Sequence, residues 1–516
     1  MRKIELYEWQ KECINKWFNS NCRGIAQVAT GGGKTFMAIY GAKMLQQEKS
    51  YLKIKILVPK TFLVHQWKSC LINDFKINKK DIGCYYGKEK CLSSRLFMIY
   101  VINSARYNLA KTILKEQNDG YSHLLILDEC HHYSSEENSK IFEFLNTKQY
   151  NHKKYFSLGL SATPKTPTSK NTIEKTIGPI FYNYSISKAM EDKIINECVL
   201  YNIKLKFTFE ESQDYDNVSK QLSKLIKILY HKCPELKIKN MKLEQFLISL
   251  KKIIRVEDDD IAKIALSILQ KMRERQNIIY NAQSRLNAIT SLIDLLYKNK
   301  KIIIFTERIT QTNALYSILN KKYRGKTSKY HSKMDDNEKQ VSLESYRLGQ
   351  SNILITCKAL DEGLNIPSSD IGIILSGNSQ ERQRIQRLGR ILRKVEGKPL
   401  SSLFYFYLGN TVEKDSLLKD TIKYTKEFNL DYNNISNKFT FPYYEKLKNT
   451  LLNEIKLKNK GLVQLFSKYL DEGTYTNDWL ESLDYIEGKR NNAINNDRKN
   501  YWYCIKSIKN LLDQNI

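Results

Sequence analysis

The chain has 516 residues, and 84 Lys and Arg against 55 Asp and Glu give it a formal net charge of +29. A chain this long is expected to form two or three domains, which excludes a peptide or a single small domain. Excess positive charge favours a polyanionic partner such as nucleic acid. A genome of biased base composition is the alternative source of so many Lys, Asn and Ile residues, so the motifs must decide.

Hydrophobic residues make up 41% of the chain and aromatic residues 11%, as in a packed globular protein. No stretch approaches the roughly 20 apolar residues of a membrane span. Met1 is not followed by a long apolar segment or a small-residue cleavage site, so we expect a cytoplasmic protein. The ten cysteines include no Cys-x-x-Cys pair, which favours reduced, buried thiols over disulfides or a zinc site.

Residues 1–198 alternate short, β-rich apolar runs with helix-length amphipathic segments. This alternation predicts βαβ units and a parallel sheet. The predicted strands are Gly24–Val28, Ile54–Val58, Phe97–Val101, Leu124–Leu127 and Tyr155–Leu160.

Residues 199–299 are rich in Lys, Leu and Ile, with apolar residues three or four apart, which predicts a helical insert or linker. A second βαβ series occupies residues 300–410, and residues 411–516 have a mostly helical period and no recognisable motif. The expected fold is therefore α/β, with two tandem doubly wound parallel-sheet domains, a helical insert and a helical C-terminal extension. The second series of predicted strands comprises Lys301–Thr306, Ile353–Thr356, Ile371–Ser376 and Leu403–Leu408.

A glycine-rich loop lies between the first predicted strand and the helical stretch Phe36–Gln47. Its backbone N–H groups can surround phosphates, while a lysine reaches the β and γ oxygens and a threonine hydroxyl holds Mg²⁺. Val28 stands where such loops usually begin with glycine, and an ordinary glycine-rich turn is the alternative. The predicted nucleotide-binding residues are Thr30, Gly31, Gly32, Gly33, Lys34 and Thr35.

An acidic pair follows the apolar strand Leu124–Leu127. Asp128 is predicted to bind Mg²⁺ through water, and Glu129 to take a proton from the attacking water. The neighbouring Cys130, His131 and His132 do not suggest zinc, because ligands at successive positions cannot all converge on one ion.

Four motifs in this order resemble those of a superfamily 2 helicase of the DExH type: Gly-Lys-Thr at 33–35, Asp-Glu-Cys-His at 128–131, Ser-Ala-Thr at 161–163 and Gln-Arg-Leu-Gly-Arg-Ile-Leu-Arg at 386–393. The resemblance covers about residues 1–410 and is nearer to the DNA-directed XPB-like group than to the RNA-directed DEAD-box group. It implies two RecA-like domains, ATP and Mg²⁺ as cofactors, and hydrolysis coupled to movement on nucleic acid.

The resemblance also implies roles for single residues. Gln10 matches the glutamine that contacts the adenine base, although Tyr7 stands where an arginine is common. His131, Ser161 and Thr163 would couple the nucleotide site to strand movement, with a hydroxyl bonded to His131; an ordinary turn closed by a proline is the alternative. Gly363, in motif V, is assigned to the nucleotide. Nucleic-acid contacts are assigned to Pro59, Thr61, Gln66, Asn103, Arg106, Thr306 and Thr356.

The second domain is expected to complete the catalytic site. Arg390 and Arg393 are three residues apart on a predicted helix and could reach the γ-phosphate, with Gln386 on the same motif. Hydrolysis would then require the two domains to close on the nucleotide. A solvated basic helix face is the alternative. Trp67, in motif Ia, is expected to pack in the core rather than stack on a base.

These observations predict an ATP-dependent motor on nucleic acid, DNA rather than RNA, without sequence preference. The resemblance implies 3′ to 5′ polarity. A duplex translocase that does not unwind, an RNA helicase and a nucleotide-gated scaffold in a defence or repair complex remain as alternatives. A separate nuclease subunit is a possible partner, and we expect no membrane association.

Overall fold

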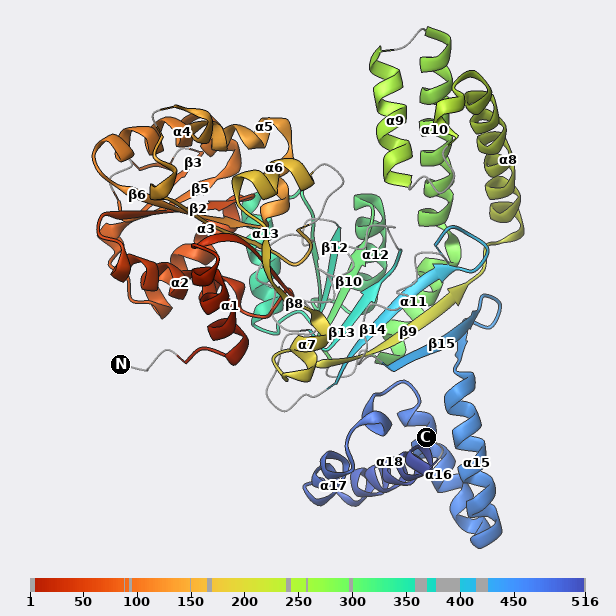
Figure 1. Cartoon of the computed structure of the whole chain (residues 1–516). Helices are drawn as coiled ribbons and strands as arrows, with labels where there is room; N and C mark the ends of the chain where they lie inside the picture. The colour runs from red at the N-terminus through yellow and green to blue at the C-terminus, as the bar shows by residue number, and fades with distance from the viewer. Residues whose placement is uncertain are drawn as a thin grey trace.

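The computed structural model describes residues 5–87, 89–91, 95–148, 150–164, 169–237, 243–256, 259–296, 300–357, 369–376, 400–413 and 426–514. Two eight-stranded sheets with helices packed on them organise the chain, which confirms the predicted α/β fold with two doubly wound domains (Figure 1). Each predicted strand is present, with its ends shifted by at most three residues.

The first sheet has the strand order β4-β3-β5-β2-β6-β7-β1-β8 and is parallel except for the β3–β4 pair. Apolar cores lie on both of its faces, which is why β2 is buried at all seven positions. We call this unit lobe 1. Its strands are β1 (Arg23–Val28), β2 (Leu52–Val58), β3 (Ile82–Tyr86), β4 (Glu89–Lys90), β5 (Phe97–Val101), β6 (Ser122–Asp128), β7 (Tyr155–Ser161) and β8 (Ile180–Tyr184). Its helices are α1 (Glu8–Asn19), α2 (Lys34–Glu48), α3 (Thr61–Ser69), α4 (Ile102–Asn118), α5 (Glu136–Ser139), α6 (Ser169–Thr176) and α7 (Ile186–Glu191).

The second sheet has the order β11-β12-β10-β13-β14-β9-β15-β16 and is parallel except for the β15–β16 pair. We call this unit lobe 2. Its strands are β9 (Glu197–Leu205), β10 (Ile302–Thr306), β11 (Thr327–Tyr330), β12 (Ile353–Cys357), β13 (Ile371–Ile374), β14 (Leu400–Leu408), β15 (Lys426–Asn433) and β16 (Lys438–Thr440). Its helices are α11 (Gln283–Leu296), α12 (Ile309–Lys322) and α13 (Asp336–Arg347).

The structure differs from the predicted domain boundaries in three places. β9 begins the range predicted as a helical insert, yet it pairs with β14 and β15 in the middle of the second sheet. α11 ends that range and packs its apolar face into the core of lobe 2. β15 and β16 extend the sheet from the region predicted to be helical, because Phe428, Leu430 and Tyr432 alternate with polar residues at the period of a strand.

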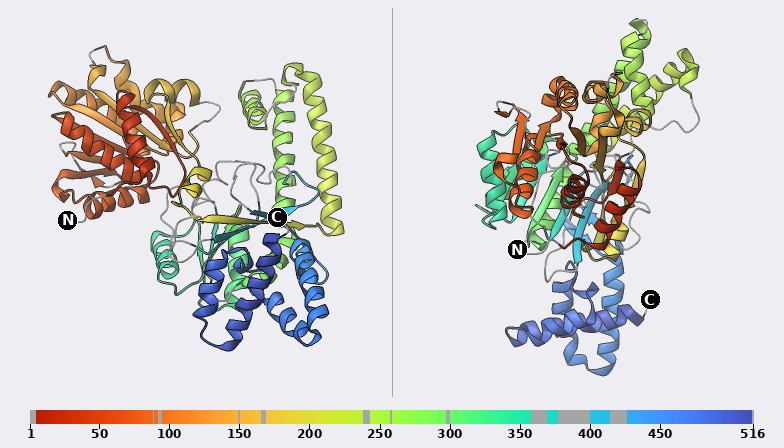
Figure 2. Two further views of the ribbon diagram at one scale, coloured as in Figure 1. Left: turned by 60° about the horizontal axis from the view of Figure 1, so that its bottom comes forward. Right: turned by 60° about the vertical axis from the view of Figure 1, so that its left-hand side comes forward.

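Two helical units project from opposite sides of lobe 2 (Figures 1 and 2). The arm consists of α8 (Phe209–Lys232), α9 (Leu243–Val256) and α10 (Asp259–Asn281), and has its own small apolar core. The C-terminal unit consists of α15 (Pro442–Lys458), α16 (Val463–Gly473), α17 (Leu483–Asn491) and α18 (Asn496–Gln514), which share the core of lobe 2.

Among the residues that the structure describes, no helix combines the length and the apolar character needed to cross a membrane. Eight of the ten cysteines are buried.

Candidate nucleotide site

The glycine-rich loop joins β1 to the N-terminus of α2. Gly31 and Gly33 have φ angles of +88° and +94°, in the left-handed region that glycine adopts without strain. A Cβ atom on Gly33 would also lie 2.9 Å from Gln10 Nε2. The loop therefore requires glycine at position 33, directly before the helix whose first N–H groups have no partner within the helix and favour an anion.

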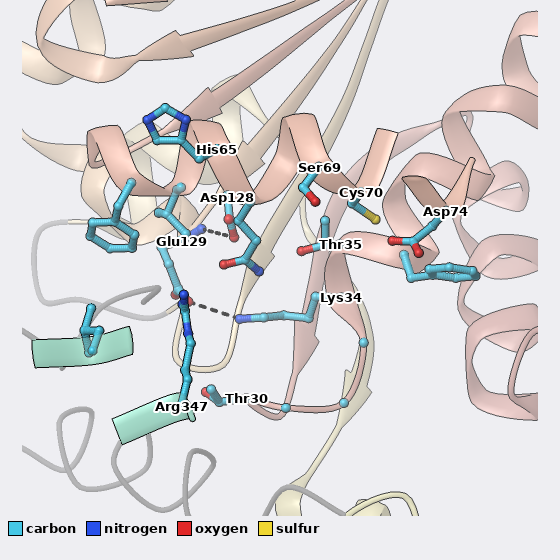
Figure 3. A pocket seen from close by; sticks show the side chains of 18 of the residues that line it. Thr30, Lys34, Thr35, His65, Ser69, Cys70, Asp74, Asp128, Glu129 and Arg347 are labelled. Carbon is cyan, nitrogen blue, oxygen red and sulfur yellow. Dashed lines mark hydrogen bonds and ion pairs between the residues drawn. The ribbon is translucent and has the colours of Figure 1, made fainter. Parts of the chain in front are cut away.

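The acidic pair lies at the carboxyl end of β6, two strands from β1 in the sheet. Lys34 Nζ lies 3.1 Å from Glu129 Oε1, so the lysine of the loop and the predicted base form an ion pair (Figure 3). Glu129 has a φ angle of +46°, a left-handed conformation that is uncommon for a residue with a side chain. Strained backbone of this kind often occurs at functional sites.

Burial and the neighbouring charges shift the three ionisable groups in different directions. Burial and the Glu129 charge raise the pKa of Asp128. Burial also acts to raise the pKa of Glu129, but Lys34 and His131 outweigh it and hold that pKa below its usual value. Burial acts to lower the pKa of Lys34, and the two carboxylates outweigh it and raise that pKa. Lys34 and Glu129 are therefore both charged at neutral pH.

Trp67 contacts this acidic pair, a contact that the sequence did not indicate. Its indole ring is fully buried, as expected of a core residue, but its Nε1–H also donates a hydrogen bond of 2.9 Å to Asp128 Oδ2. The only signal available from the sequence was the position of Trp67 in motif Ia.

Gln10 lies beside the phosphate loop. Its side-chain amide donates to the carbonyl oxygen of Gly33 at 3.2 Å and accepts from the backbone N–H of Tyr7 at 2.9 Å. The contact of Gln10 with an adenine base stays a prediction.

The predicted hydrogen bond between His131 and a hydroxyl of the Ser-Ala-Thr loop is present. His131 Nδ1 lies 3.0 Å from Ser161 Oγ, which in turn accepts from the backbone N–H of Thr163 at 3.1 Å. The same His131 nitrogen lies 3.7 Å from Glu129 Oε2. A continuous polar path thus joins the predicted base to the loop after β7.

The phosphate loop, Gln10 and the acidic pair line one cavity of about 1860 Å³ between the two lobes. The phosphate loop, the acidic pair and the outer face of α3 form its lobe 1 wall. One face of α13 forms the opposite wall, and Arg347 extends from it toward Thr30 and Glu129 (Figure 3). The α13 residues of this wall lie on one face of the helix, with Lys339 and Gln340 adjacent and the others three or four residues apart, but nothing in the sequence indicated which element they face. They are Asp336, Lys339, Gln340, Leu343 and Arg347.

The donor set of the cavity fits a nucleoside triphosphate with Mg²⁺. The buried hydroxyl of Thr30 has no hydrogen-bond partner among the residues that the structure describes, and the loop N–H groups and Lys34 add further donors for phosphate oxygens. Thr35 and Asp128 supply the hard oxygen ligands that Mg²⁺ prefers.

The residues predicted to contact nucleic acid differ in exposure and in surroundings. Thr61 and Gln66 line the same cavity as the phosphate loop, and Pro59 is half-buried at the end of β2. Asn103 is exposed at the start of α4, where its side chain accepts from Arg106; Arg106 also bonds to Asn138.

Thr306 and Thr356, which the resemblance assigns to nucleic-acid contacts, are buried inside lobe 2. The Thr306 hydroxyl pairs with Thr312 Oγ1 at 2.7 Å and with the carbonyl oxygen of Thr356 at 3.2 Å. A nucleic-acid contact at these positions would have to come from the backbone. Four further predicted residues lie outside the described part of the chain: Gly363, Gln386, Arg390 and Arg393.

Two family models match the chain. The model of the type III restriction enzyme res subunit matches residues 3–166, and that of the helicase conserved C-terminal domain matches residues 284–395. These ranges contain the phosphate loop and acidic pair on one side, and the α13 wall of the cavity on the other.

The chain is also similar to individual proteins. It is 29% identical over 402 residues to the DNA 3'-5' translocase XPB2 of Sulfurisphaera tokodaii, which covers 77% of this chain and 81% of that protein. It is 28% identical over 198 residues to the type I restriction enzyme EcoAI endonuclease subunit of Escherichia coli, over 36% of this chain and 22% of the subunit. The Pyrococcus furiosus Hef helicase domain shares the fold, with a TM-score of 0.51 and 14% identity over 80% of this chain and 97% of that domain.

The two RecA-like lobes, the site between them and the two family matches define an ATP-hydrolysing helicase of superfamily 2. Within that superfamily the chain resembles the XPB-like group, to judge by its similarity to XPB2 over most of both chains.

Proposed function

We propose that the chain is a DNA motor that hydrolyses ATP with Mg²⁺ and translocates 3′ to 5′ along one strand without reading its sequence. The observation that carries the hydrolytic part is the Lys34–Glu129 pair beside Asp128, at the base of a cavity with walls from both lobes. DNA and the polarity rest on the similarity to a protein named as a DNA 3'-5' translocase.

The residues of the site suggest how hydrolysis would proceed. Lys34 leaves Glu129 and turns to the β- and γ-phosphates, and Glu129, released from the pair, accepts a proton from the attacking water. Thr35 and Asp128 would hold Mg²⁺, which neutralises charge on the phosphates. Arg390 and Arg393 are proposed to act from lobe 2, and the polar path through His131 and Ser161 to couple the γ-phosphate to the loop after β7.

The arm supports the assignment of a polyanionic substrate. Lys220, Lys224 and Lys227 are exposed on one face of α8 at spacings of four and three residues. Arg308, just after β10, donates to Asn277 at the base of the arm at 2.8 Å. We propose that the arm moves with lobe 2 and extends the track for DNA beyond the lobes.

A duplex translocase that does not unwind is the second candidate, because the XPB2 relative is named a translocase rather than a helicase. A nuclease partner is part of the proposal, since the matching family model is named for a restriction enzyme subunit. Co-purification of the full chain with products of neighbouring genes tests that partner. The proposal places the protein in the cytoplasm, where ATP and DNA are both available.

The test is ATP hydrolysis with no polymer, single-stranded DNA, duplex DNA and single-stranded RNA, with Lys34→Ala as the inactive control. We expect DNA to stimulate hydrolysis more than RNA. Strand displacement from 3′- and 5′-tailed duplexes gives the polarity, and triplex displacement without strand separation would identify the duplex translocase. ATP binding without hydrolysis under every condition would refute the motor and favour the scaffold.

A further inference from the structure

The hydrogen bond from Trp67 to Asp128 crosses from one element to another. Trp67 lies on α3, which follows β2, and Asp128 ends β6, the strand that pairs with β2 in parallel. The indole ring has no exposed surface, and its Nε1–H donates to Asp128 Oδ2 at 2.9 Å. The donor therefore reaches the carboxylate from inside the lobe, on the side away from solvent.

The second carboxylate oxygen is held as well. Asp128 Oδ1 accepts from the backbone N–H of Glu129 at 3.0 Å. With one donor on each oxygen, the carboxylate cannot rotate without breaking a hydrogen bond, and each oxygen keeps a second lone pair. Asp128 lines the nucleotide cavity, so those lone pairs are the ones available to a ligand there.

We propose that Trp67 is a positioning residue of the ATP site, whose indole N–H orients the Asp128 carboxylate toward the Mg²⁺ that accompanies the nucleotide. The inference rests on the proposed role of Asp128 as an Mg²⁺ ligand. Partners behind a ligating carboxylate set its orientation, and removing one commonly lowers metal affinity or activity roughly 10–100-fold. Trp67 thus packs in the core of lobe 1 and also orients a side chain of the ATP site.

Lobe 1 contains a matched control for this tryptophan. Trp17 is also buried in the same core, and its Nε1–H also donates at 2.9 Å, but to the carbonyl oxygen of Ser157. Trp17 does not line the nucleotide cavity. Replacing either ring by Phe removes a buried N–H donor and leaves a similar cavity, because phenyl is smaller than indole, so only the substitution at 67 can act through Asp128.

The experiment measures binding of a fluorescent ATP analogue to the full chain, with Mg²⁺ and with EDTA, together with the melting temperature. For Trp67→Phe we expect the Mg²⁺-dependent part of the affinity to fall roughly 10-fold or more, with affinity in EDTA within about 2-fold of wild type. Trp17→Phe should lower the melting temperature and leave both affinities unchanged. Wild-type Mg²⁺ dependence in a folded Trp67→Phe protein would overturn the proposal.

A double-mutant cycle shows whether Trp67 acts through Asp128. If it does, Trp67→Phe causes little further loss of Mg²⁺-dependent affinity in the Asp128→Asn background. Losses of affinity from the two substitutions that multiply in the double variant would overturn the proposal. If Asp128→Asn alone keeps full Mg²⁺-dependent binding, the assigned role of Asp128 is wrong and the inference fails with it. Should Trp67→Phe not fold, 3-benzothienylalanine at position 67 replaces the N–H by sulfur and preserves the ring volume, and the same criteria apply.

Discussion

Glu129→Gln separates binding of ATP from its hydrolysis. The substitution keeps the size of the side chain and an oxygen that can accept from Lys34, but it removes the group that takes a proton from water. Loss of a general base typically slows a reaction 10²–10⁴-fold, which is about 3–5 kcal/mol of transition-state stabilisation. We therefore expect kcat to fall by that factor.

Binding of ATP in the ground state should not weaken in the Glu129→Gln variant. Lys34 and Glu129 lie 3.1 Å apart, with side chains only 11% and 8% exposed. At an effective dielectric constant of about 20 their attraction is about 5 kcal/mol, partly offset by the cost of removing both charges from water. Lys34 must give up this attraction when it turns to the phosphates. Without the competing carboxylate, ATP should bind at least as tightly as to the wild-type protein.

Two assays test these expectations. Steady-state hydrolysis with saturating DNA gives kcat, and titration with a fluorescent ATP analogue gives Kd. Glu48→Gln, at the exposed end of α2 in the same lobe, is the matched control and should change neither. Hydrolysis within about 5-fold of wild type would refute the role of Glu129 as the base. A folded variant that no longer binds ATP would show that Glu129 holds the loop in place instead.

Three further results are expected. Binding to single-stranded DNA should weaken with salt at a log–log slope of about −3 to −4, as for about 4–6 neutralised phosphates, and a flat response would favour biased composition as the source of the net charge. Arg347→Ala should lower the rate of ATP hydrolysis roughly 10-fold, which is less than the loss expected for a true arginine finger such as the one predicted at Arg393. Arg324→Ala, on the surface, should have no effect. Equal rates of hydrolysis for these two variants would show that Arg347 does not belong to the site. Burial lowers the pKa of His123, so the unfolded chain binds a proton below about pH 6.5 that the folded chain resists, and the free energy of unfolding should fall on acidification by up to about 1.4 kcal/mol per pH unit. His123→Gln should flatten the dependence of the unfolding free energy on pH, measured by denaturant titrations at several pH values, whereas His231→Gln should not. An unchanged pH dependence in both variants would refute the assignment of this effect to His123.

The local sequence determined the strands and helices and the functional side chains at their ends. A glycine-rich loop between an apolar strand and a helix, and two acids after another such strand, place phosphate donors and carboxylates at the same edge of a parallel sheet. These features depend on backbone conformation and on periods of two or 3.6 residues, which a short stretch of chain already specifies. The hydrogen bond between His131 and Ser161 followed because both residues lie at the carboxyl ends of neighbouring strands, Ser161 as the last residue of β7 and His131 shortly after β6.

Other features depended on contacts between distant segments. From its sequence, β9 is predicted to lie at the start of a helical insert. Pairing with β14, about two hundred residues away in the chain, makes it instead a strand in the interior of the second sheet. The Thr306 hydroxyl is buried because helix α12 offers it the Thr312 hydroxyl and the neighbouring strand β12 offers it the Thr356 carbonyl oxygen. Trp67 became a donor to Asp128, and α13 became a wall of the nucleotide cavity, only through the packing of whole elements. Sequence periodicity specifies which face of an element is buried, whereas the order of strands and the approach of the lobes decide what that face meets.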